Sequence, residues 1–230
     1  MIIPLTEKQK MLLNDSYRIQ KTLFLVFLCF TFLSFSQEKK LHFLKPNKVG
    51  ISFITGTENN FLFNDADYEY KTKIIKVLLS YDINTWKNID IDFIILPQLR
   101  KINHQLLNMW FVTADVPNYQ EKRIRFTQPK TMYIYGIQFG IQIEKKIYKR
   151  LNIFTSVNVG IATIDTETER LAKGFTFIEN GFVGFSFKSS TNTNLFIGGN
   201  IGHVSNFNIK KPNSGYNQLG LEIGFSYNLK

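Results

Sequence analysis

The chain has 230 residues, which is enough for a single domain with a sizeable core. Its net charge of +10 suits an anionic partner, such as nucleic acid, an acidic membrane surface or the phosphates of lipopolysaccharide. No basic helix or nucleic-acid motif accompanies this charge, so nucleic acid is not expected as a partner. The 22 phenylalanines and 10 tyrosines, in an alternating sequence dotted with glycine, indicate β structure.

The first 37 residues have the features of a secretory signal peptide and leader. An apolar run, Leu23–Leu33, follows Lys21 and ends in small and polar residues, with cleavage expected after residue 36 or 37. The run is too short for a comfortable transmembrane helix, and a buried N-terminal helix is the alternative. The only cysteine, Cys29, lies in this run, so the mature chain at 38–230 is expected to form one domain without disulfide or thiol chemistry.

Eight segments of the mature chain alternate between apolar and polar side chains, with the period of two that a β-strand requires. In all eight, the odd-numbered positions are apolar, and the even-numbered positions carry acidic, basic, amide, serine or glycine residues. The segments are 49–53, 72–83, 89–99, 132–144, 151–163, 173–187, 194–202 and 218–227. The pattern predicts an all-β chain of eight strands.

Two architectures share this alternation. A soluble sandwich buries the apolar face, whereas a membrane barrel turns it toward lipid and fills its lumen with a polar network. The signal peptide, the strand lengths of about 10 residues and the even strand count favour an eight-stranded antiparallel up-and-down transmembrane β-barrel in a Gram-negative type of outer membrane. The connections alternate between short and long, as periplasmic turns and extracellular loops do. A closed barrel also leaves no unpaired edge, which a bilayer requires.

Three polar residues near the C-terminus interrupt the apolar face. His203, Ser205 and Asn217 are odd-numbered, so they share the parity of the apolar positions. An unpaired polar group in an apolar medium costs roughly 2–7 kcal/mol, which favours pairing among these residues. A serine beside a histidine that can accept its proton is the minimal activated nucleophile. The alternative is a polar pair tolerated near the headgroups of a barrel that has no catalytic role.

The motif His-x-Ser-Asn at 203–206, with Asn-x-Gly at 213–215 and an alternating last strand, resembles the outer-membrane lipid A 3-O-deacylases, the PagL-type acyloxyacyl hydrolases. The resemblance implies a barrel whose site faces lipid A in the outer leaflet and removes its 3-position acyl chain. By position, Ser205 is then the nucleophile and His203 its general base, with Asn206, Asn213 and loop amides as oxyanion donors. The implied reaction needs no cofactor, and no Cys, His or carboxylate spacing supports a metal site.

The sequence departs from the family at the third catalytic position, because Asn217 stands where the family usually has a glutamate. An amide can orient an imidazole but cannot offset imidazolium charge. If the turn between the sixth and seventh strands centres on Thr191, antiparallel pairing places Glu179 opposite His203. A loop centred on Lys210 likewise places Asn217 opposite His203. We expect Glu179 to supply or support the missing charge, and a role as a rim residue at the bilayer interface is the alternative.

Two rival functions also fit the sequence. One is a non-enzymatic outer-membrane barrel with a structural, adhesion or surface-protection role, which has no use for His203 and Ser205 together. The other is an acyltransferase, which normally needs an acceptor path into the barrel. The longest connection, 100–131, is expected to be a basic loop that is solvated or attracts lipid A phosphates, with a solvated His104. Whether the chain forms a homodimer is also open.

Overall fold

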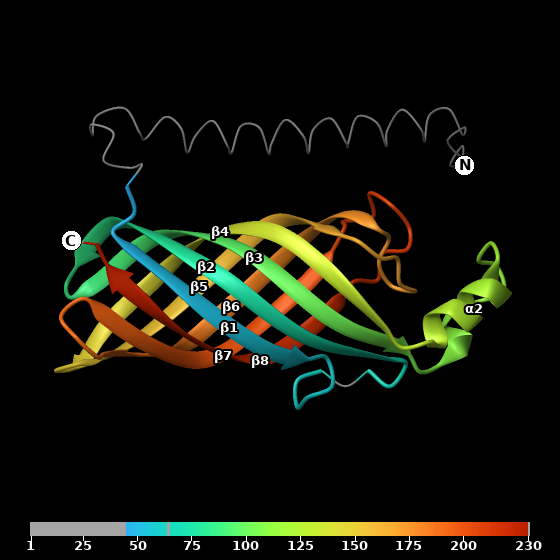
Figure 1. Cartoon of the computed structure of the whole chain (residues 1–230), viewed down its shortest axis with the longest axis horizontal. Coiled ribbons are helices and arrows are strands. Elements are labelled where there is room, and N and C mark those ends of the chain that lie inside the picture. The colour runs from blue at the N-terminus through green and yellow to red at the C-terminus, as the bar shows by residue number, and fades with distance from the viewer. Residues whose placement is uncertain (1–44, 64, 230) are drawn as a thin grey trace, which may run out of the picture. The chain divides into compact units, whose positions relative to one another are not determined.

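The computed structural model describes residues 45–63 and 65–229, and the expected signal peptide at 1–37 lies outside this range. Eight antiparallel strands close into one barrel, with each strand beside its neighbours in sequence and β8 beside β1 (Figure 1). The strands are β1 Lys48–Thr57, β2 Tyr68–Trp86, β3 Ile89–Leu106, β4 Lys130–Tyr148, β5 Leu151–Ile164, β6 Gly174–Lys188, β7 Thr193–Ser205 and β8 Tyr216–Asn228. The predicted eight-stranded up-and-down barrel is confirmed.

The register of the strands gives the barrel its tilt. A path of directly paired residues leaves β7 at Thr193, crosses the other seven strands and returns to β7 at His203, ten residues further along. This stagger requires the strands to run obliquely to the barrel axis, with the tilt of roughly 35–45° that is typical of closed barrels. A row of paired residues therefore climbs along the axis as it passes around the barrel.

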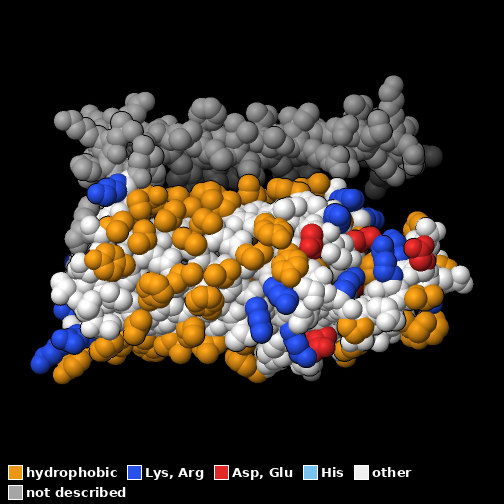
Figure 2. All heavy atoms as spheres, viewed as in Figure 1, with side chains coloured by type: hydrophobic (Ala, Val, Ile, Leu, Met, Phe, Trp, Pro, Cys, Tyr) orange, Lys and Arg blue, Asp and Glu red, His pale blue; other side chains and the backbone are white. Residues whose placement is uncertain are grey.

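The outer face of the barrel is largely apolar, and Figure 2 shows one side of it. Its large exposed side chains come from the odd-numbered positions predicted from the sequence, among them Phe53, Val77, Phe139, Val159, Phe185, Ile197 and Phe225. A band of exposed apolar side chains suits a hydrocarbon environment and would be unfavourable in water. No helix within the described residues is long and apolar enough to cross a membrane.

The middle of the lumen is filled by a buried polar network, as the even-numbered positions predicted. Glu222 on β8 lies at its centre and accepts hydrogen bonds from Ser52 Oγ (2.6 Å), Asn200 Nδ2 (2.8 Å) and Lys76 Nζ (3.3 Å). Buried polar groups are tolerated when they are paired in this way. The middle of the lumen is therefore filled by polar side chains that bind one another.

One end of the lumen differs from the polar filling that was expected. At the end of the barrel that carries the long connections, even-numbered side chains are apolar and pack into one buried cluster. The cluster includes Tyr70, Ile102, Met132, Ile134, Ile164, Ile178, Val204 and Tyr216. This cluster, which we call the apolar plug, fills the lumen beneath the long connections.

Short and long connections alternate as predicted. The short turns are 87–88, 149–150 and 189–192, and the long connections are 58–67, 107–129, 165–173 and 206–215. The connection at 107–129 contains a 3-10 helix, η2 (Met109–Phe111), and an α-helix, α2 (Tyr119–Thr127), which lies beyond the strand ends (Figure 1). We call the end of the barrel with the long connections the long-loop end, and the other the short-turn end.

The prediction that the longest loop begins at Arg100 and contains a solvated His104 is wrong. Strand β3 continues to Leu106, and both side chains point into the lumen, where they are almost fully buried. Arg100 donates hydrogen bonds to Asn180 Oδ1 (2.7 Å) and Gln98 Oε1 (2.9 Å). Both residues are even-numbered, so continued alternation beyond position 99 could have placed them inside.

Candidate active site

His203 and Asn217 are direct cross-strand partners on β7 and β8 near the long-loop end. The imidazole Nδ1 lies 2.6 Å from Asn217 Oδ1. An amide oxygen carries no hydrogen, so Nδ1 must donate the proton of this hydrogen bond. In the neutral imidazole, Nε2 is then the unprotonated nitrogen and can accept a proton. The pairing of these two residues, predicted from a loop centred on Lys210, is confirmed.

Ser205 is the last residue of β7 and shares the outer face with His203, two positions away. Only 8% of its surface is exposed, while Asn217 is exposed and His203 is half-buried. The carbonyl oxygen of Ser205 accepts a hydrogen bond from Thr176 Oγ1 at 2.9 Å, which fixes the end of β7 to β6. Among the described residues no hydrogen bond joins Ser205 Oγ to His203. Catalytic hydrogen bonds are often long before substrate binds and shorten in the complex.

Gly215 packs against the proton-accepting edge of the imidazole. It has a positive φ of 65°, a conformation that suits glycine. A Cβ atom at this position would lie 2.6 Å from the carbonyl oxygen of Val204, 3.1 Å from His203 Cε1 and 3.3 Å from His203 Nε2. The motif glycine therefore allows the loop backbone to approach the imidazole closely, and it leaves no room for a side chain there.

The motif asparagines build the loop at 206–215. The backbone N–H of Asn206 donates to Asn213 Oδ1 at 2.7 Å. Asn206 Nδ2 donates to the carbonyl oxygen of Lys210, also at 2.7 Å. Asn213 Nδ2 makes only a long contact of 3.5 Å with Asn208 Oδ1. Asn206 follows Ser205 in the chain and binds Asn213, and Asn213 Nδ2 is the donor that is less committed within the loop.

Arg170 ties this loop to the connection at 165–173. Its Nε donates to the carbonyl oxygen of Gly215 at 2.7 Å, and its own carbonyl oxygen accepts hydrogen bonds from the N–H groups of Ser214 (2.8 Å) and Gly215 (3.3 Å). Its guanidinium lies over the ring of Tyr68, 4.3 Å from the centroid, and 3.4 Å from Asp65 Oδ2. Arg170 thus links three of the long connections at Gly215, the glycine that packs against His203. Nothing in the sequence motif pointed to it.

Glu179 on β6 is the cross-strand partner of His203 on its other side. The predicted register is therefore confirmed on both sides of the histidine. The Glu179 side chain is half-buried and has no hydrogen bond or ion pair with any other described residue. Glu179 and His203 are neighbours by register, but the contact with Nδ1 belongs to Asn217.

The apolar plug supports the site from inside the barrel. Val204 and Tyr216 alternate with the site residues, point inward and are fully buried. The Tyr216 ring stacks on Tyr70 with 4.3 Å between centroids, and Tyr70 packs against His104 at 4.6 Å. His104 Nε2 in turn lies 3.0 Å from Oε1 of Glu169, in the same connection as Arg170. Sequence analysis missed this buried pair because it depends on a loop folding back over the lumen.

The chain matches the family model described as "Lipid A 3-O-deacylase (PagL)" over residues 90–226. The match extends from β3 into β8 and includes all the candidate site residues. The chain belongs to the PagL family of lipid A 3-O-deacylases. Membership of the PagL family makes it a hydrolase of the outer membrane and implies lipid A 3-O-deacylase activity, with lipid A as the substrate.

Solved structures of small barrels are similar to the chain at low sequence identity. The crystal structure of the outer membrane enzyme PagL has 13% identity and a TM-score of 0.49, with coverage of 76% of this chain and 97% of that one. Neisserial surface protein A has 10% identity and a TM-score of 0.44, with coverage of 79% and 96%. The Yersinia pestis outer membrane protein Ail has 9% identity and a TM-score of 0.38, with coverage of 79% and 99%. A comparison with curated proteins finds no match.

Proposed function

We propose that this PagL family member hydrolyses the 3-position acyl ester of lipid A with Ser205 as nucleophile and His203 as general base. The observation that supports this assignment most is the 2.6 Å contact between His203 Nδ1 and Asn217 Oδ1. Because this contact places the ring proton on Nδ1, it leaves Nε2 free to take the Ser205 proton. Asn217 thereby has the orienting role of the third triad member.

The reaction has two steps. His203 Nε2 accepts the hydroxyl proton as Ser205 Oγ attacks the ester carbonyl, and the resulting imidazolium gives the proton to the departing sugar oxygen. The acyl-enzyme is then hydrolysed by water, which His203 deprotonates, and the fatty acid leaves as Ser205 regains its proton. Asn213 Nδ2 and backbone amides of the loop at 206–215 are the proposed donors to the oxyanion, with Asn206 holding Asn213 in place.

The lipid-facing position of the site determines how substrate reaches it. Lipid A in the outer leaflet can diffuse laterally to His203 and Ser205, so no aqueous pocket is needed. An aromatic group on the same outer surface offers contact for the acyl chain: Phe177 is the cross-strand partner of Ser205 and packs edge-on against Phe207 at 4.7 Å between centroids. Burial of acyl methylene groups against these rings stabilises the complex by about 0.8 kcal/mol for each group.

The neutral Asn217 leaves the imidazolium without a partner charge at its Nδ1. We propose that Glu179 offsets this charge from the opposite strand, because it is the other cross-strand partner of His203 and is not held by any other ion pair within the described residues. A carboxylate on either side of the ring stabilises the charge that develops when Ser205 is deprotonated.

Mass spectrometry of lipid A tests the proposal. A host that expresses the native chain should lose one hydroxyacyl mass from its lipid A, and the Ser205→Ala variant should not, at equal outer-membrane abundance. Ser189→Ala, an exposed serine in the short turn after β6, is the matched control and should retain the native result. If native and Ser205→Ala spectra are identical and unmodified, the chain is a structural barrel or an enzyme silenced by Asn217, and Asn217→Glu separates these outcomes.

A further inference from the structure

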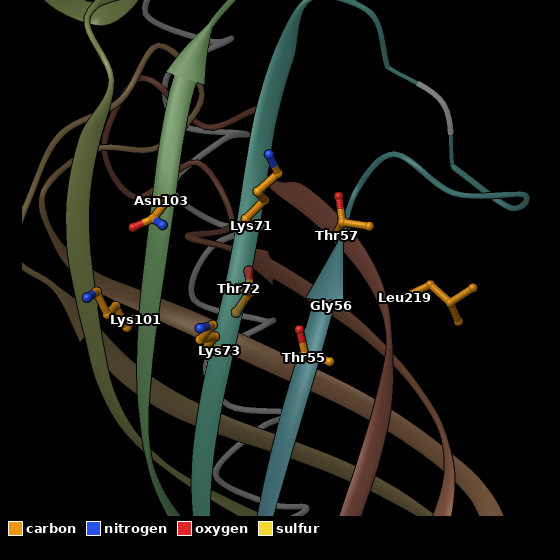
Figure 3. Close-up of a pocket in the computed structure, with 9 residues that line it drawn as sticks. All are labelled: Thr55, Gly56, Thr57, Lys71, Thr72, Lys73, Lys101, Asn103 and Leu219. Atoms are coloured by element: carbon orange, nitrogen blue, oxygen red, sulfur yellow. The ribbon is translucent and has the colours of Figure 1, made fainter.

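A hollow of about 540 Å³ lies on the outer face of the barrel, across β1, β2 and β3 (Figure 3). Three of the residues that line it are lysines, Lys71, Lys73 and Lys101, and all three are exposed. Hydroxyl and amide groups of Thr55, Thr57 and Asn103 surround them. All six positions are odd-numbered, so these polar side chains occupy the face that is mostly apolar on the rest of the barrel.

The charges in this hollow are unbalanced. Lys73 and Lys101 are direct cross-strand partners on β2 and β3, and they share the outer face. Like charges opposite each other destabilise a strand pair. Lys71 has an ion pair with Glu69, but neither Lys73 nor Lys101 has one with any residue in the described part of the chain. An anion between Lys73 and Lys101 would remove the repulsion.

An apolar hollow of about 390 Å³ adjoins the lysines toward the middle of the barrel. Its floor is formed by Phe53, Ile75, Leu99, Leu221 and Ile223, and Lys73 and Lys101 also line it. Together, the two hollows place cationic side chains toward the long-loop end and apolar side chains toward the middle of the barrel. This arrangement fits an amphiphile with an anionic head and an acyl tail.

The lysines lie at the membrane level of the candidate catalytic pair. A row of paired residues runs from Gly199 on β7 through Leu221, Thr55 and Lys73 to Lys101 on β3. A complete circuit of the barrel climbs ten residues, from Thr193 to His203. The path from β7 to β3 takes four of the eight steps, so it climbs about half of those ten residues along the barrel axis. Lys101 therefore lies near the level of Val204, not near the level of Gly199.

The position of β3 in the ring of strands places the lysines on the other side of the barrel from Ser205. Strand β3 is four steps from β7 in a ring of eight strands, so Lys101 lies opposite Ser205. The lysine hollow therefore cannot belong to the ester-cleaving groups, although both meet the membrane at the same depth. A molecule bound there is distinct from the one whose ester contacts Ser205.

We propose that the two hollows bind the lipid A part of a second lipopolysaccharide molecule. One phosphate lies between Lys73 and Lys101, with the nearby hydroxyl and amide groups as further donors, and one acyl chain lies over Phe53, Leu99 and Leu221. Lysine ammonium groups bind phosphate as point charges, and hydrocarbon burial adds to the binding. The bound lipid holds the barrel at a depth that keeps His203 and Ser205 level with the headgroups.

Native mass spectrometry of the purified full-length protein in detergent tests this binding directly, independently of catalysis. Bisphosphorylated lipid A is added to the Ser205→Ala protein, and the number of bound molecules is counted. Adding Lys73→Gln and Lys101→Gln should remove one bound lipid A, or weaken its binding about tenfold. The matched control is Lys145→Gln with Lys146→Gln, two exposed lysines at the short-turn end of β4, which should leave the count unchanged.

Two further additions identify the ligand. Lipid A without phosphates should fail to fill the site, and millimolar inorganic phosphate should not displace the bound lipid. Unchanged binding in the Lys73→Gln, Lys101→Gln protein would overturn the proposal, as would equal loss in the Lys145→Gln, Lys146→Gln control. Displacement by inorganic phosphate would indicate a site for free phosphate instead of a lipid. Each result stands whether or not the native chain deacylates lipid A.

Discussion

Asn217 Oδ1 lies 2.6 Å from His203 Nδ1, in the position from which a triad acid would orient the imidazole. The two residues are direct partners on adjacent strands, so the barrel register itself sets this contact. The amide fixes the ring and its tautomer, but it supplies no negative charge. The His203–Asn217 pair therefore has the arrangement of the base and the orienting residue of a triad, but the amide lacks the negative charge of a triad acid.

Replacing Asn217 with glutamate should raise activity. A carboxylate in a triad stabilises the imidazolium, and an Asp-to-Asn change in a serine protease costs about 10⁴ in kcat, so we expect kcat of Asn217→Glu to rise at least roughly tenfold. The measurement is the rate of fatty-acid release from lipid A by purified protein. Asn217→Gln has the length of glutamate without its charge and should not reproduce the gain. A rate that is equal in both variants would show that the charge at this position is not limiting.

Glu179→Gln tests whether the opposite strand supplies the missing charge. Loss of a nearby carboxylate close to the protein surface should lower kcat about fivefold, because the imidazolium loses an attraction on the order of 1 kcal/mol. In the Asn217→Glu background the same substitution should have a smaller effect, since the new carboxylate already stabilises the ring. This pair of measurements is a double-mutant cycle. Native activity in the single variant Glu179→Gln would make Glu179 a rim residue.

Gly215→Ala should disable the enzyme while leaving the barrel folded. The added Cβ would lie 2.6 Å from the Val204 carbonyl oxygen and 3.3 Å from His203 Nε2, so the loop or the imidazole must move. A displacement near 1 Å at a reacting group can cost about a hundredfold in rate. Gly199→Ala on β7 is the control, because no atom beyond its two chain neighbours lies within 4 Å of its Cβ position. Electrophoretic mobility before and after heating would show that both barrels remain folded, and full activity in Gly215→Ala would contradict the proposed close packing.

The strands and the cross-strand neighbours of His203 could be predicted from sequence because they depend on local alternation and on counting across turns. Parity placed Phe185 and Ile197 outside, and the turn centres placed Glu179 and Asn217 beside His203. Loop contacts follow no such period. The buried His104–Glu169 pair depends on a connection that folds back over the lumen, so the sequence did not predict it.

Arg170 should act as a positioning residue for the same glycine. Its Nε holds the Gly215 carbonyl oxygen at 2.7 Å, and its backbone carbonyl oxygen binds the N–H groups of Ser214 and Gly215. Arg170→Ala removes the side-chain contacts with Gly215, Tyr68 and Asp65 and keeps the two backbone hydrogen bonds. We therefore expect kcat to fall about tenfold, as for the loss of the charge-assisted hydrogen bond to Gly215, with KM unchanged. Arg170→Lys keeps the charge but lacks the planar guanidinium that reaches both Gly215 and Asp65, and it should rescue little of the loss.

The effects of the substitutions on kcat and on KM, measured separately, distinguish two roles for Arg170. A cation near a site that faces phosphorylated lipid could instead bind substrate, and its removal would then raise KM and leave kcat unchanged, with Arg170→Lys restoring the native value. A fall in kcat without rescue by lysine indicates that Arg170 acts through Gly215 on the imidazole. Initial rates over a range of lipid A concentrations in mixed micelles, measured for the native protein and both variants, distinguish these two roles.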